Sequence, residues 1–134
     1  MSVSNALQKA EVAALRASAP LVSLTGGTAR VFDHVPEDAA FPYVRVGEHQ
    51  EVDDSTTADR GFEVYSTVHT WSRAPGRVEA KALNAAVRDA LDAPLSLTGF
   101  RLVSRDFVDA RVMDDPDGVT AHGVVTLRYL IRPE

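Results

Sequence analysis

Acidic side chains gather in the run from Asp114 to Gly118, and carboxylates at this density are the groups that bind Ca²⁺. An EF-hand loop also needs spaced acids, a glycine at its sixth position and a glutamate at its twelfth. This run has neither that length nor the distal glutamate. Its Pro-Asp-Gly segment favours a turn, because proline presets φ and glycine accepts a positive φ. We therefore predict a turn without a metal, whose charges are available to a partner.

The histidines stand alone at His34, His49, His69 and His122, and none lies four residues from another. The His-Glu-x-x-His motif of zinc enzymes is absent. The chain also has no cysteine, which excludes disulfides, thiolate catalysis and cysteine-based zinc sites. The sequence thus predicts no metal site.

Serine, histidine and aspartate are all present, but no Gly-x-Ser-x-Gly segment would hold a nucleophile at a strand-to-helix turn. The pair Gly26-Gly27 lacks the further glycines of a phosphate loop or a dinucleotide site. We predict no catalytic residue and no cofactor, so the chain is not expected to be an enzyme. One alternative stays open: a small α+β domain that binds or isomerises a small molecule, with His69 or Asp106 pointing into an apolar pocket.

Trp71, the single tryptophan, ends an apolar run whose residues of the same parity include Tyr65 and His69. A tryptophan here is most often a core or sheet-edge aromatic. The alternative is an interface anchor, since tryptophan is enriched at binding hot spots.

Two helices are expected from apolar residues at helical spacing. The first is capped by Ser2 or Ser4 and runs to about Ser18, with Glu11 on its solvent side and Pro20 as its stop. The second begins near Pro75 and ends before Pro94.

Alternating apolar residues predict strands over Tyr43–Val52 and Phe62–Trp71, and Val31-Phe32 is a possible brief strand. A long hairpin follows, with arms at 100–113 and 119–132. Each arm would reach roughly 40 Å. A compact domain of this size has a radius of gyration of about 14 Å. The hairpin must therefore bend around the core or project, and a projecting strand edge needs a covering partner.

The element order is helix, strand, strand, helix, strand, strand. It predicts an α+β fold, with a mainly antiparallel four-stranded sheet, both helices on one face and a long C-terminal hairpin. A chain of 134 residues is expected to form a single domain, 1–134.

The net charge of −5 argues against nucleic-acid binding through a large basic face. No signal-peptide pattern and no apolar run long enough for a membrane span occur, so a protein made in a cytoplasm is expected.

Two acidic segments are the candidate partner-binding sites. The polar segment from Glu48 to Arg60 has too few apolar residues to offset its ordering entropy, so we expect it to be mobile until a partner orders it. The second segment is the hairpin turn. The predicted interface residues are Glu51, Asp53, Asp54, Asp59, Arg60, Asp114, Asp115 and Asp117.

Five segments carry a resemblance to a known family, through their order and spacing. They are Val31-Phe32-Asp33-His34-Val35-Pro36, Phe41-Pro42-Tyr43-Val44-Arg45-Val46-Gly47, Val68-His69-Thr70-Trp71-Ser72, the alanine-rich helix from Gly76 to Leu91, and Asp117-Gly118-Val119-Thr120-Ala121-His122-Gly123. Together they resemble the tail completion, or tail terminator, family of long-tailed phages, prophages and phage-like gene transfer agents.

The resemblance implies a structural virion protein that forms a ring, typically hexameric, on the head-proximal end of the tail tube. Such a ring ends tube polymerisation and joins the tail to the head connector. The implied partners are other copies of the chain, the tail tube protein and the head-tail connector, with DNA passing through the lumen without specific binding. An acidic protein suits that channel, because it repels phosphates. The resemblance implies no catalytic residue.

Overall fold

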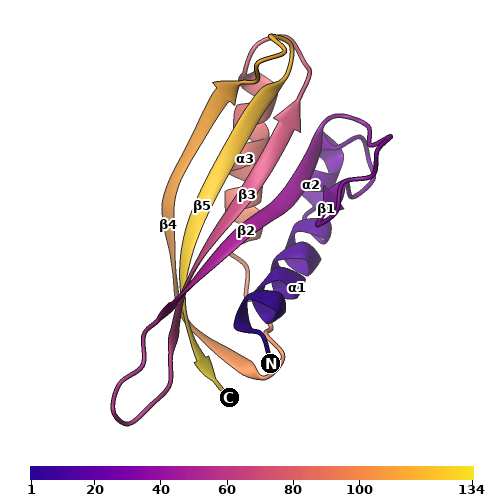
Figure 1. Ribbon diagram of the computed structural model, residues 1–134. Helices are drawn as coiled ribbons and strands as arrows, with labels where there is room; N and C mark the ends of the chain where they lie inside the picture. The colour runs from indigo at the N-terminus through magenta and orange to yellow at the C-terminus, as the bar shows by residue number, and fades with distance from the viewer.

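A computed structural model describes all residues from 1 to 134 as helices packed on one face of a twisted sheet (Figure 1). The elements are α1 (Val3–Arg16), α2 (Ala19–Leu24), β1 (Val31–Phe32), β2 (Tyr43–Asp53), β3 (Phe62–Ser72), α3 (Val78–Ala90), β4 (Phe100–Asp114) and β5 (Ala121–Pro133). No helix is long and apolar enough to cross a membrane.

The sheet has five strands in the order β1-β2-β3-β5-β4, so the prediction of an α+β fold is confirmed and that of four strands is wrong. The additional strand is β1, where Val31 pairs with Val44 in parallel, which makes the sheet mixed. The other pairings are antiparallel. A strand of two residues carries too little alternation to be predicted firmly from sequence.

Helix α1 begins as predicted, because the Ser2 hydroxyl accepts a hydrogen bond from the backbone N–H of Asn5. Its apolar stripe, including Val3 and Leu7, is buried. The prediction that Glu11 faces solvent is wrong, since Glu11 is fully buried. Helical spacing places Glu11 beside Leu7 on the inner face, and partners from the sheet compensate its charge.

Pro20 does not end the helical region, as the sequence suggested, but lies in the first turn of α2, where a proline needs no N–H donor. The Ser18 side chain caps this second short helix. The other predicted helix begins later than expected, because Pro75 lies before α3, whose first residue is Val78. The structure therefore has three helices where two were expected.

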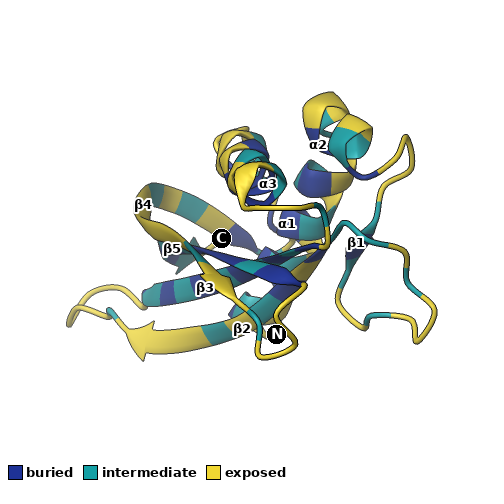
Figure 2. Cartoon of the chain, turned by 90° about the horizontal axis from the view of Figure 1, so that it is seen from above, coloured by how far each residue is buried: buried dark blue, intermediate teal, exposed yellow.

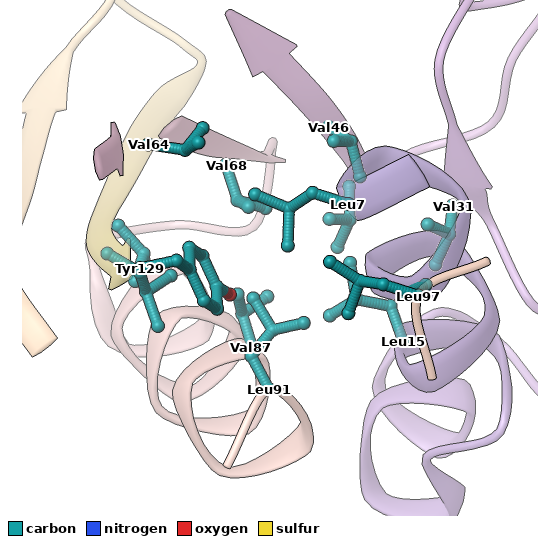
Figure 3. Close-up of a cluster of buried hydrophobic side chains, with 14 of the residues drawn as sticks. Leu7, Leu15, Val31, Val46, Val64, Val68, Val87, Leu91, Leu97 and Tyr129 are labelled. Carbon is teal, nitrogen blue, oxygen red and sulfur yellow. The ribbon is translucent and has the colours of Figure 1, made fainter. Parts of the chain in front are cut away.

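The hydrophobic core lies between the sheet and the three helices (Figure 3). The hairpin residues Val125, Leu127 and Tyr129 belong to the same cluster as Val87 of α3 and Leu91, which follows that helix. Residues on the opposite side of β5, such as His122, face away from the helices. The burial alternation over 121–131 is that of a central strand covered on one face.

The segment from Glu48 to Arg60 is divided between strand β2, which includes residues 48–53, and the connection to β3, which includes residues 54–60. Strand β2 continues to Asp53, and its register with β3 extends from Tyr43 opposite Trp71 to Asp53 opposite Phe62, with a shift between Val46 and His49. The polar side chains of residues 48–53 suggested a loop. They lie in a strand because this end of the β2–β3 hairpin projects past the core, where its side chains are largely exposed to solvent (Figure 1). Only residues 54–61 form the connection.

Strand β4 is the free edge of the sheet, and most of its residues are exposed (Figure 2). It pairs with β5 alone and contains two register shifts, after Leu102 and after Phe107. Such shifts bend a strand and discourage uncontrolled edge-to-edge pairing. The β4–β5 hairpin was expected either to bend around the core or to project from it. In the structure β5 packs on the core, whereas β4 lies largely outside it.

Candidate interaction surfaces

The acids at the end of β2 and in the β2–β3 connection contact neighbouring side chains. Glu51 accepts a hydrogen bond from the Ser4 hydroxyl, and Asp53 accepts one from Ser55. Asp54 pairs with Arg132 of β5 at 3.1 Å. The carboxylate of Asp59 makes no ion pair and is exposed, and the guanidinium of Arg60 lies 5.9 Å from the ring centre of Phe62.

The acids at the β4–β5 turn have three different environments. Asp117 accepts hydrogen bonds from the backbone N–H groups of Val119 and Thr120 and from the Thr120 hydroxyl. These bonds lower the pKa of Asp117 to about 2. Asp114 pairs with Arg77, which precedes α3, while Asp115 has no ion pair. Asp117 thus shapes the turn, and Asp115 leaves its charge to solvent.

These two acidic groups lie at opposite ends of the sheet (Figure 1). Phe62, which follows the first group, pairs with Ile131 near the C-terminus, whereas Asp114 pairs with Ala121 at the start of β5. The predicted interface residues therefore cannot form one continuous surface. They offer one acidic contact at each end of the molecule.

A polar aromatic cluster lies on the sheet face that no helix covers. The Trp71 ring stacks on His122 with 3.7 Å between ring centres, and His69 Nδ1 lies 2.8 Å from His122 Nε2. His69 Nε2 also contacts Glu48 Oε1 at 2.9 Å. Trp71 is half-buried and outside the hydrophobic core, so the interpretation as a core residue is wrong.

Sequence reasoning missed this cluster because β3 and β5 are separated by α3 and β4, and only their pairing makes Trp71 and His122 direct neighbours. Burial, followed by repulsion from His69, lowers the pKa of His122. Hydrogen bonding from His69 lowers the pKa of Glu48. The cluster therefore favours the neutral form of His122 within a chain of hydrogen-bonded side chains.

A second missed cluster lies inside the core. The buried Glu11 carboxylate accepts hydrogen bonds from the hydroxyls of Ser66 and Tyr129 and lies 2.8 Å from His49 Nε2. Burial, and then the negative charge of Glu11, raise the pKa of Tyr129 far above its usual value. The network joins α1 to β2, β3 and β5. Every member is satisfied, which is typical of a structural polar network.

The small-molecule alternative required His69 or Asp106 to point into an apolar pocket on the helix side. His69 lies on the opposite face of the sheet, and Asp106 is exposed and pairs with Arg128 at 3.1 Å. A groove on the helix side, between α3 and β4, is lined by eight charged residues, Asp106 among them, so it is not an apolar pocket. These positions contradict the arrangement that the alternative required.

The fold and its surfaces define a class of protein: a small α+β domain with a long exposed strand edge and charged ends. Comparison with known proteins specifies the class further. Residues 9–132 match the family model described as tail completion protein gp17. The chain belongs to this family, as the sequence resemblance indicated, and the family consists of structural tail proteins rather than enzymes.

Individual relatives agree with this assignment. The chain is 33% identical over 129 residues to the tail completion protein gp17 of Bacillus phage SPP1. This alignment covers 96% of this chain and 93% of that protein. The structure of SPP1 gp17 superposes with a TM-score of 0.63 at 31% identity, over 94% of this chain and 88% of that one. A chain from the virion of a native gene transfer agent particle superposes with a TM-score of 0.90 at 32% identity, over 98% of both chains.

Proposed function

We propose that this protein forms a ring, with six copies, on the head-proximal end of a tail tube. The ring ends tube polymerisation and joins the finished tail to the head connector, and DNA passes through its lumen. The protein is a component of a phage virion or of a phage-like particle. Its partners are other copies of itself, the tail tube protein and the connector.

The observation that carries this proposal is the match over 98% of both chains to a component of a gene transfer agent virion. The name of the SPP1 relative gives the stage of assembly, tail completion. The exposed edge strand β4 supplies the unpaired backbone groups that an assembling subunit can cover. The net charge of −5 suits a channel through which DNA passes without being held.

Within this proposal the two acidic ends of the sheet have separate roles. One end carries Glu51, Asp53 and Asp59, and the other carries Asp114 and Asp115. A subunit whose two ends face different neighbours can contact the tube with one end and the connector with the other. We assign the predicted interface residues to these two contacts.

Deletion of the gene tests the function. Heads are expected to fill with DNA and to remain unjoined, while tails accumulate with variable length because nothing caps the growing end. Electron microscopy of the lysate measures both effects, and expression of the intact chain from a plasmid is the control. Normal numbers of joined, transfer-competent particles in the deletion strain would contradict the proposal.

A further inference from the structure

A groove of about 920 Å³ runs between α3 and the exposed strand β4. Phe107, Ala110 and Val112 of β4 contribute apolar surface to it. Phe107 is 37% exposed, although it lies on the helix side of the sheet. The groove is therefore a partly apolar surface with a charged lining.

The charge of this groove is opposite to that of the whole chain. Its lining includes five cations and three carboxylates, whereas the chain has a net charge of −5. Lys81, Arg88 and Arg111 have no carboxylate within ion-pair distance, and the Arg88 guanidinium lies 3.8 Å from the centre of the Phe107 ring. The lining cations are Arg77, Lys81, Arg88, Arg105 and Arg111, and the carboxylates are Asp89, Asp92 and Asp106.

The complementary charge lies on the opposite flank of the molecule. Strand β1 is the other edge of the sheet, and the connection from Asp33 to Pro42 follows it (Figure 2). Asp33, Glu37 and Asp38 of this connection are exposed and make no ion pair. The same connection carries small apolar residues between its acids, which suit a groove that is partly apolar.

We infer that the α3–β4 groove binds the 33–42 connection of a second copy of this chain. The inference rests on the proposed ring and names the surfaces that would close it. A groove on one flank and its acidic ligand on the other make a heterologous contact, which generates a ring when it is repeated with closing rotation. Opposite charges at the contact set its register and disfavour the reverse orientation.

Cross-linking in assembled particles tests the contact directly. The chain has no cysteine, so Glu37→Cys combined with Lys81→Cys introduces the only two thiols in this protein. Treatment of purified tails with a flexible bis-maleimide is expected to give a ladder of covalent multimers of this chain. Each single variant, and the pair Glu37→Cys with Thr126→Cys on the helix-free face, are the controls and are expected to give none.

A charge exchange tests the same contact by function. Lys81→Glu alone and Glu37→Lys alone are each expected to lower the yield of joined particles about tenfold or more, because repulsion is repeated at every subunit interface. Both side chains are exposed, so neither variant disturbs the core. The combined variant is expected to restore most of the yield. Neutral single variants, or a combined variant worse than both, would overturn the inference.

Imaging of the same tails separates this inference from the proposed function. A six-fold ring together with the ladder supports both. A six-fold ring without the ladder overturns the assignment of the groove and leaves the ring intact. Tails with no ring of this chain overturn both.

Discussion

At the residue scale, Glu11 is the side chain on which the buried polar network depends. Glu11→Ala leaves the hydroxyls of Ser66 and Tyr129 and the ring of His49 without their acceptor in the core. We expect a loss of about 3 kcal/mol in the free energy of unfolding. Denaturant titration measures it, with the exposed Glu37→Ala as the matched control. Equal stabilities for the two variants would show that the network contributes nothing.

His122 gives a second prediction, because it stacks on the only tryptophan. Its lowered pKa means that the folded state favours neutral imidazole. The resulting stability is present above the unfolded pKa of about 6.5 and is lost as pH falls through the folded pKa. His69, Glu48, Arg111 and Asp115 supply the charges that surround it.

Trp71 fluorescence should therefore change with a midpoint below about pH 6.5 as the stacked imidazole becomes charged. His122→Phe keeps a stacked ring and removes the titrating group, so its emission is expected to stay constant over the same range. A titration unchanged in this variant would assign the signal to His69 instead.

At the element scale, the last strand is held by its helix-facing side. Leu127 is 2% exposed and belongs to the core cluster. Leu127→Ala is expected to lower the free energy of unfolding by about 2–5 kcal/mol, since it leaves a cavity under α3. Leu130→Ala, on the helix-free side of the same strand, is the control and should cost clearly less. Similar losses for both would mean that the two faces of β5 are equally packed.

Substitutions in the β4–β5 turn can distinguish an effect on folding from an effect on assembly. From the sequence alone, all acids of this turn are expected to be available to a partner. The structure revises this for Asp117, whose bonds to Val119 and Thr120 hold the turn. Asp117→Ser is expected to lower the melting temperature, whereas Asp115→Ser should leave it unchanged.

If the turn contacts the tube or the connector, Asp115→Ser should still reduce head–tail joining in a complementation assay. A fully active Asp115→Ser protein would restrict the turn to a structural role. Circular dichroism supplies the melting temperatures for both variants.

Local patterns predicted those elements whose signal is contained in one segment. Period-2 alternation located β3, β4 and β5 to within one or two residues, and Ser2 marked the start of α1. The path of β1 and the neighbourhood of Trp71 and His122 depend on which strands pair, and no single segment carries that information. Glu11 was assigned to the solvent side because of its polarity, although its helical position is on the buried stripe. The groove along α3 could not be predicted, because its shape depends on the bend of β4.

At the scale of the whole molecule, the protein is a subunit with two different flanks and two acidic ends. One edge of the sheet carries the acidic connection after β1, and the other carries the cationic groove beside β4. In the proposed ring, neighbouring copies would cover the exposed strand edge and the partly apolar groove. Closed cyclic assembly covers every copy in the same way.

Electron cryomicroscopy of purified tails, with symmetry imposed only after an unsymmetrised reconstruction, tests this account most directly. We predict a ring of six copies of this chain at the head-proximal end, with the 33–42 connection of each copy against α3 and β4 of the next. A head-proximal end without six-fold density from this chain would contradict the account.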